Sequence, residues 1–339
     1  MNYLKQAVGI DIAKDELVCK AGRFYSDQSI EVMEQASFPN QMDGFEQLHH
    51  WVREVLGETD SPIWFVMEAT GVYYEELAYY LHSNAQLVSV LLPNKVKYFA
   101  KTLTIKSKTD ALDAEIILRI GLERKLDPWN PPSPEMRTIR ILTRELQEVK
   151  RKRTATKNQH HAKSHAHGVP SSTLQRLTQQ IDFLNQQIKE IESELKKIVQ
   201  QDEVLRQKVE RLETIPGVGF PTIITLIGET NGFALFRNAR QLVSYAGLDL
   251  VLRESGNWRG KTTISKKGNR FIRRAVFMPA LSAVQHNQGL KAFYKRLCER
   301  KPAKKIGLTA VARKILVLVY TLWKNEEEFM LEKMLPQNA

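Results

Sequence analysis

The 339-residue sequence predicts an α/β domain, followed by a long coiled-coil helical segment and a mostly α-helical C-terminal domain. Strand-like runs alternate with helical patterns in the N-terminal part, an order typical of a sheet covered by helices. Leucine and isoleucine then recur every three to four residues between positions 174 and 212, which is typical of a coiled coil. We therefore expect domains at 1–128, 129–212 and 213–339, with the prolines between 128 and 134 marking the first linker.

The first domain is expected to begin with three successive strands and to continue with alternating helices and strands. The run IWFVM at 63–67 is apolar throughout, which is typical of a strand buried on both faces. Expected strands cover 7–12, 17–22, 30–33, 63–67 and 87–92, and expected helices cover 43–56, 72–81 and 110–124. This order is that of the ribonuclease H-like fold.

The apolar repeat between Leu174 and Leu212 is interrupted only at Asp202. At 1.5 Å per residue such a helix is roughly 60 Å long, and its apolar stripe has to be covered. Either the basic helix expected at about 135–167 or a second subunit can pack on this stripe, and both can do so at once. We expect a homo-oligomer, a dimer or a tetramer, formed through this coiled coil.

In the C-terminal domain, the segment IPGVG at 215–219 and the apolar helix expected at 222–227 have the form of a helix-hairpin-helix turn. Gly217 and Gly219 would let the backbone approach a phosphate, toward which the first amides of the next helix point. The alternative is that the Pro-Gly pair forms only a turn between two helices.

Basic residues are concentrated in the C-terminal two thirds of the chain. The formal net charge is +12, yet residues 1–100 contain 7 basic and 14 acidic residues, while 101–339 contain 43 and 24. Three basic clusters lie at 150–167, 251–274 and 291–305. Such density favours a polyanionic partner through counterion release, although a solvated surface is the simpler alternative. The nucleic-acid-binding candidates are Gly217 and Gly219 with Lys150, Arg151, Lys152, Arg153, Arg253, Arg259, Lys261, Lys266, Lys267, Arg270, Arg273 and Arg274.

The sequence also excludes several classes of protein. Its two cysteines, Cys19 and Cys298, cannot form a Cys-based zinc site and fit a reducing compartment. The most apolar segment, 306–323, contains Arg313 and Lys314 in its middle, which argues against a membrane span. The pair His161/His165 has a metal-ligand spacing, but no acid or cysteine lies near it, so we interpret these histidines as polyanion contacts or surface.

Two acidic residues are associated with expected strands. Val8, Ile10 and Ile12 share one face of the first strand, so Asp11 projects from the other face beside Gly9. Glu68 directly follows the buried strand at 63–67, where a carboxylate is costly without a cation or hydrogen bonds. The simpler alternatives are that Asp11 pairs with a lysine and that Glu68 caps the helix starting near Val72.

Two further aspartates occupy one expected helix. At roughly 100° per residue, Asp110 and Asp113 share the apolar face of the helix at 110–124, so both should face the sheet. The alternative for Asp110 is a capping box with Ser107, which does not account for Asp113. Together with Asp11 and Glu68, the aspartates favour a cluster for hard cations such as Mg²⁺. Two such cations about 4 Å apart assist phosphoryl transfer.

Several segments resemble one protein family, in the family's order and over nearly the whole chain. They are GIDIAK at 9–14, MEATG at 67–71, KTDALDA at 108–114, IPGVG at 215–219, RQLVSYAGL at 240–248, ESG at 254–256 and SKKGNRFIRR at 265–274. The set is similar to the motifs of IS110-family transposases, which are RuvC-like recombinases of bacterial insertion sequences. The resemblance implies a RuvC/ribonuclease H-like first domain.

The resemblance also implies roles for particular residues. Asp11, Glu68, Asp110 and Asp113 match the family's acidic tetrad, which binds Mg²⁺. Ser255 matches the serine that attacks DNA and forms a phosphoserine link; without the resemblance it would be a loop serine. The family further implies a composite site that joins two domains, and a structured non-coding guide RNA that pairs with target and donor DNA.

Around Ser255, three basic residues suit the neutralisation of a scissile phosphate. They are Arg253, Arg259 and Lys261, while Gly256 permits the backbone to approach DNA closely. Two other functions remain open: a RuvC-like junction nuclease that uses only the acidic cluster, and a non-catalytic scaffold that binds nucleic acid.

Overall fold

The computed structural model describes residues 3–57, 61–69, 71–103, 109–252, 254–256, 258–260, 262–300 and 303–330. The chain forms two compact units, Met1–Pro131 and Pro132–Ala339. The boundary lies in the proline-rich segment that was expected to be a linker. The second unit contains both the region expected at 129–212 and the region expected at 213–339, and one apolar core runs through both.

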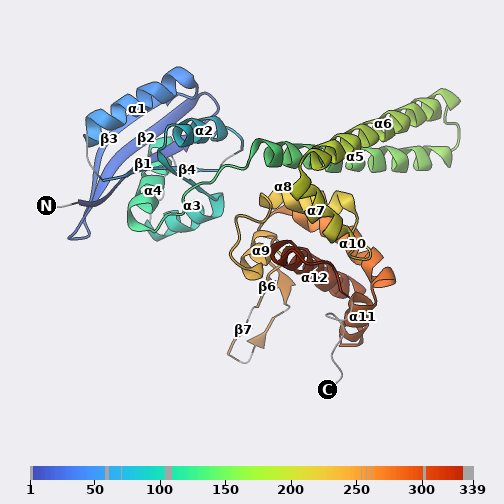
Figure 1. Ribbon diagram of the computed structural model, residues 1–339. Coiled ribbons are helices and arrows are strands. Elements are labelled where there is room, and N and C mark those ends of the chain that lie inside the picture. The colour runs from blue at the N-terminus through green and yellow to red at the C-terminus, as the bar shows by residue number, and fades with distance from the viewer. Residues whose placement is uncertain are drawn as a thin grey trace. The chain divides into compact units, whose positions relative to one another are not determined.

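The first unit is a mixed five-stranded sheet with helices on both faces (Figure 1). The strand order is β3-β2-β1-β4-β5, with β1–β3 antiparallel and β4 and β5 parallel to β1. This topology is compatible with the expected RuvC-like domain. The strands are β1 (Tyr3–Ile12), β2 (Glu16–Tyr25), β3 (Ile30–Pro39), β4 (Ile63–Glu68) and β5 (Leu87–Leu91). The helices are α1 (Met42–Leu56), α2 (Glu75–Ser83), α3 (Pro93–Ala100) and α4 (Asp110–Glu123), with a 3₁₀ turn at Lys101–Leu103.

Two apolar layers enclose this sheet, and they confirm the predicted faces. Val8, Ile10 and Ile12 pack with buried residues of α1 and α2 on one face. On the other face, Ala7 and Val66 pack with α3 and α4. Since the neighbours of Val66 in β4 pack on the first face, β4 is buried on both sides, as its unbroken apolar run predicted.

The second unit begins with two long helices, α5 (Pro134–Ser164) and α6 (Ser171–Gln201), which pack against each other (Figure 1). The apolar stripe of α6 shares one core with Leu142, Leu146 and Val149 of α5, so the basic helix covers much of the stripe within one chain. Toward the turn between the helices, Leu174 and Leu177 remain only half-buried. The buried residues of the stripe are Leu184, Ile188, Ile191, Leu195 and Val199.

The single helix expected across 174–212 is in fact two helices. The first, α6, ends before Asp202, and α7 (Glu203–Glu213) begins directly after it. The Asp202 carboxylate accepts a hydrogen bond from the amide of Leu205 at 3.0 Å, which caps α7. The residue that interrupts the apolar repeat therefore marks the break between the helices.

The rest of the second unit is helical, with a small strand-containing arm. Its helices are α8 (Phe220–Thr230), α9 (Ala239–Tyr245), α10 (Arg270–His286), α11 (Gln288–Arg300) and α12 (Lys304–Asn325). By length and composition α12 is apolar enough to cross a membrane, with a mean hydropathy of 1.6 over its best window. Val311, Ile315 and Val319 of this helix are fully buried in the core, so α12 serves as a core helix of this unit.

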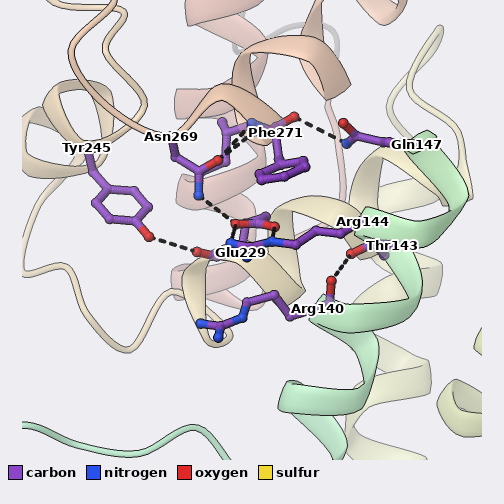
Figure 2. A network of polar contacts seen from close by, with 9 residues as sticks. Arg140, Thr143, Arg144, Gln147, Glu229, Tyr245, Asn269 and Phe271 are labelled. Carbon is purple, nitrogen blue, oxygen red and sulfur yellow. Dashed lines mark hydrogen bonds and ion pairs between the residues drawn. The ribbon is translucent and has the colours of Figure 1, made fainter. Parts of the chain in front are cut away.

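A polar network around the buried residue Glu229 links four elements of the second unit (Figure 2). The side chain of Glu229, at the end of α8, is fully buried and accepts hydrogen bonds from Arg144 of α5 at 2.5 and 2.9 Å. Asn269 donates to the same carboxylate at 2.6 Å and accepts from the amide of Phe271, capping α10. Tyr245 of α9 donates to the Glu229 carbonyl at 3.4 Å. The network therefore fixes α5, α8 and α9 around the start of α10.

Replacing Glu229 by alanine is expected to lower the free energy of unfolding of the second unit by about 3–5 kcal/mol, because Arg144 and Asn269 would lose their shared acceptor. Urea denaturation of the full chain measures the change. The control is Glu148→Gln, which removes an exposed ion pair with Arg151 and should cost less than about 1 kcal/mol. If both variants lowered the free energy of unfolding equally, the network around Glu229 would not be a main source of stability.

Candidate active site and nucleic-acid interface

Two of the four predicted carboxylates lie at the ends of neighbouring parallel strands. Asp11 is near the end of β1, and Glu68 is the last residue of β4. Ile10 and Met67 are direct partners in the pairing of these strands, so the residues that follow them are adjacent. Both Asp11 and Glu68 are half-buried. The carboxyl ends of the two central strands thus bring these side chains to one edge of the sheet.

The other two carboxylates are in the first turn of α4. Asp113 is half-buried, whereas Asp110 is exposed, so the expectation that both face the sheet is wrong for Asp110. Asp110 starts the helix, and its side chain has no turn of helix before it to cover it. The cap of α4 is Thr109, whose hydroxyl accepts from the amide of Leu112 at 3.3 Å. Ser107, the alternative capping residue, lies outside the described residues.

Gly9 allows α4 to pack closely on β1, the strand that carries Asp11. A Cβ atom at Gly9 would lie 2.2 Å from the amide nitrogen of Leu118 and 2.4 Å from the carbonyl oxygen of Ala114. The backbone of α4 therefore occupies the space that any side chain would need. Beside this contact, Lys20 of β2 binds Glu115 of α4 at 2.9 Å and holds the helix on the sheet.

Replacing Gly9 by alanine is expected to destabilise the first unit by about 3 kcal/mol or more, because the new methyl group overlaps backbone atoms that cannot rotate away. Thermal melting of the full chain measures this change. The matched variant is Gly121→Ala in α4, where the new Cβ lies 2.9 Å from a Val66 methyl group and the helix gains propensity. That variant should change stability by at most about 1 kcal/mol, and equal effects would count against the close packing at Gly9.

The other three predicted carboxylates act electrostatically on Asp11. Burial raises the pKa of Asp11 to about 6, and the charges of Asp113, Asp110 and Glu68 add to the rise. A half-buried carboxylate surrounded by like charges is unfavourable, and a cation would relieve this repulsion. The charges that shift the pKa of Asp11 are those of acidic residues, with no lysine of the described ranges among them.

The four carboxylates are the kind of ligand that Mg²⁺ prefers, although their side chains are not close enough together to enclose an ion. Carboxylate oxygens are the ligands that hard cations prefer. Besides burial, the charges of the other three carboxylates raise the pKa of Asp11. Among the described residues, no three acidic, histidine or cysteine side chains come together closely enough to enclose a metal ion. Asp11, Glu68, Asp110 and Asp113 therefore remain predicted ligands.

Ser255 lies in an arm of the second unit that we define as residues 250–264. The base of this Ser255 arm is the pairing of β6 (Leu250–Val251) with β9 (Thr263–Ile264). Its outer part is the pairing of β7 (Glu254–Ser255) with β8 (Trp258–Arg259), which Figure 1 shows extending away from the helices of this unit. Ser255 is exposed, as are both residues of β8.

The base of the Ser255 arm is held by hydrogen bonds that the sequence did not reveal. Ser265 donates its hydroxyl to the Asp249 carboxylate at 2.5 Å, and its amide to the Asp249 carbonyl at 2.9 Å. The Lys266 amide donates to the Gly247 carbonyl at 3.0 Å. Asp249 and Ser265 border a cavity of about 440 Å³. The two ends of the arm are thus joined to each other and to the loop that leads into α10.

The structure brings together basic residues that are far apart in the sequence. Lys150 and Arg151 of α5 line one groove of about 550 Å³ with Arg274 of α10, and Pro221, Thr222 and Thr225 of α8 line it too. Lys152 is also exposed, whereas Arg253 and Lys261 lie outside the described residues. The exposed basic residues in or next to the Ser255 arm are Arg259, Lys266, Lys267 and Arg270.

Other predicted nucleic-acid contacts have partners inside the chain. Lys150 binds Glu192 of α6 at 2.7 Å, and Arg153 donates to Asn185 at 3.2 Å. Arg273 donates to the carbonyl of Ala246 at 2.7 Å, and burial lowers the pKa of its guanidinium. These contacts give the side chains a structural role, and their binding of nucleic acid remains a prediction.

The predicted helix-hairpin-helix turn joins α7 to α8. A Cβ atom at Gly217 would lie 2.6 Å from backbone atoms of Ala283, so this glycine permits close packing against α10. Gly219 is exposed at the start of α8. Gly217 thus has a packing reason for its lack of a side chain, and phosphate binding by either glycine remains a prediction.

Comparison with known proteins identifies the class as transposase. A family model described as "Transposase" (DEDD_Tnp_IS110) matches residues 8–163, and another, described as "Transposase IS116/IS110/IS902 family", matches residues 209–295. The chain belongs to the IS110 family of transposases and is a DNA recombinase or transposase.

Full-length relatives support this assignment. The chain is 27% identical over 329 residues to the pilin gene-inverting protein of Moraxella bovis, covering 96% of this chain and 98% of that protein. It is 28% identical to the pilin gene-inverting protein of Moraxella lacunata, with 96% and 98% covered. It is also 27% identical to the transposase for insertion sequence element IS1111A of Coxiella burnetii (strain RSA 493 / Nine Mile phase I), over 35% of this chain and 34% of that protein.

Proposed function

We propose that this transposase is an RNA-guided recombinase that cuts and rejoins DNA through a covalent bond between Ser255 and a DNA phosphate. The observation that carries the proposal is the exposed position of Ser255 in the outer part of an arm with exposed basic neighbours. An exposed hydroxyl is accessible to a DNA backbone, and the basic side chains offset the negative charge of the DNA phosphates.

In the proposed reaction, the Ser255 Oγ attacks phosphorus and loses its proton. An O–P bond forms, one P–O bond to a neighbouring sugar breaks, and the departing sugar oxygen takes up a proton. The product remains a phosphodiester, so the hydroxyl of another strand can attack it, rejoin the DNA and free the serine. This route needs no external energy source for the rejoining step.

Asp11, Glu68, Asp110 and Asp113 would hold Mg²⁺, and the charge that the other three exert on Asp11 supports this assignment. When bound, Mg²⁺ would lower the pKa of an attacking hydroxyl and stabilise charge on the leaving oxygen. The carboxylates would hold such a cation at the edge of the sheet, where Asp11 and Glu68 lie at or near the ends of adjacent strands.

The remaining partners follow from family membership and charge. The exposed end of α5 includes Lys157 and His161, and His165 follows it directly. This end offers a basic surface to a guide RNA or to DNA. The half-buried Leu174 and Leu177 of α6 support a contact with a second subunit. Relatives named for inverting a pilin gene are consistent with strand exchange as the outcome.

The second candidate is a junction nuclease that uses only the acidic cluster, since carboxylates with Mg²⁺ suffice for hydrolysis. The two functions differ in whether a covalent protein–DNA intermediate forms. The test is to react the full chain with DNA of its element ends, its guide RNA and Mg²⁺, denature the mixture, and map any modified residue by mass spectrometry. An adduct on Ser255 supports recombination, and cleavage without an adduct supports the nuclease.

A further inference from the structure

Trp258 is an exposed aromatic residue next to the proposed nucleophile. Its exposed fraction is 60%, although an indole usually gains stability by burial. In the described part of the chain, Trp258 makes no close contact with another ring or with a cation. The other four tryptophans do: Trp51 lies 5.7 Å from Phe38, Trp64 5.9 Å from Lys5, Trp129 5.1 Å from Tyr79 and Trp323 5.7 Å from Phe233.

The strand pairing determines where the indole lies. Ser255 and Trp258 are direct partners in the antiparallel pairing of β7 and β8. Directly opposed residues project from the same face of a hairpin, with Cβ atoms about 4.5–5.5 Å apart. Gly256, with φ of 54°, begins the two-residue connection between them, as such tight hairpins require. The indole therefore lies beside the Ser255 hydroxyl on one face of the arm.

The charges around the arm favour a nucleic acid as the occupant of this face. Lys266 and Lys267, just beyond the arm, are exposed. Arg259 is exposed as well, and it pairs with Glu254 on the opposite face of the hairpin from Trp258. An exposed apolar ring on a basic part of the chain suits a nucleotide, which combines a flat base with a phosphate. A surface that binds a protein partner would be expected to have a larger apolar centre and a rim of mixed charge.

We propose that Trp258 stacks on an unpaired base beside the phosphate that Ser255 attacks. The proposal rests on the proposed role of Ser255 and adds that the substrate is unstacked at the cut. In a continuous duplex each base is covered by its neighbours, so an indole reaches a base face only where stacking is broken. Trp258 thus favours single-stranded or distorted DNA at the site of reaction.

The test measures binding and crosslinking without the chemical step. The full chain carrying Ser255→Ala is mixed with a single-stranded oligothymidylate of about a dozen nucleotides that contains 5-iododeoxyuridine, or with the same strand in a duplex. Fluorescence anisotropy gives the affinity, and peptide mapping after irradiation gives the crosslinked residue. Trp258→Ala and Trp258→Phe are compared with Leu252→Ala, a control on the same arm that is 63% exposed.

We expect crosslinks at Trp258 and a roughly 5- to 100-fold loss of single-strand affinity in Trp258→Ala. Trp258→Phe should retain most of the affinity, while Leu252→Ala and all duplex affinities should change less than about twofold. Equal losses in Trp258→Ala and Leu252→Ala, or a change in oligomeric state instead of DNA binding, would overturn the proposal. The nucleophile assignment fails by a different measurement: a covalent protein–DNA adduct would still form in Ser255→Ala.

Discussion

Replacing Ser255 by alanine is expected to abolish the covalent protein–DNA adduct and to reduce strand exchange to background. The hydroxyl is the atom that forms the bond to phosphorus, so its removal leaves no route to the intermediate. Ser255 is exposed, and the substitution should leave the folding stability within about 0.5 kcal/mol of wild type. Denaturing electrophoresis of labelled DNA measures the adduct, and anisotropy measures retained DNA binding.

Two hydroxyl variants at nearby positions serve as controls. Thr262→Ala removes an exposed hydroxyl from the same arm and should leave the adduct intact. Ser265→Ala removes the hydroxyl that binds Asp249, and should weaken the arm's base without abolishing the adduct. An adduct that survives in Ser255→Ala but disappears in Ser265→Ala would transfer the nucleophile to Ser265. Undiminished cleavage in Ser255→Ala would favour the nuclease.

Replacing Asp11 by asparagine is expected to lower the rate of strand cleavage by about a thousandfold while stabilising the metal-free protein. Asp11 is half-buried and repelled by three other carboxylates, so removing its charge should raise the free energy of unfolding by about 1–2 kcal/mol, after allowance for solvent screening. In the wild type Mg²⁺ should supply the same relief. Thermal melting with EDTA and with Mg²⁺ measures both effects.

The control for this variant is Asp15→Asn, which removes an exposed carboxylate just beyond β1. It should keep the stabilisation by Mg²⁺ that Asp11→Asn loses. A metal-induced shift of equal size in wild type and Asp11→Asn would rule out Asp11 as a ligand. Removal of Mg²⁺ by EDTA should stop adduct formation in the wild type.

Local patterns predicted most elements of the first unit. The unbroken apolar run of β4 and the alternation in β1 are local signals, and the structure confirms both. The helix α3 (Pro93–Ala100) was not predicted, because it has only eight residues and begins with proline. The break at Asp202 was visible as an interruption of the heptad pattern, but its conversion into a helix cap depends on backbone geometry.

The candidate site was predictable only in part. Asp11, Glu68, Asp110 and Asp113 were identified from their positions at expected strands and in an expected helix, and Ser255 from the family motif alone. Elsewhere in the chain, the buried carboxylate of Glu229 went unnoticed because nothing around it in the sequence marks it as buried. Its partners in α5 and at the start of α10 are 85 and 40 positions away. Contacts of that separation have no periodic signature in a single sequence.

The sequence by itself determined the order of strands and helices, the charge asymmetry and the family motifs, because these depend on residues close together in the chain. The tertiary structure decided which helix covers the stripe of α6 and how closely α4 approaches Gly9. These features depend on packing between distant segments, where the exclusion of overlapping atoms and the burial of charge select one arrangement.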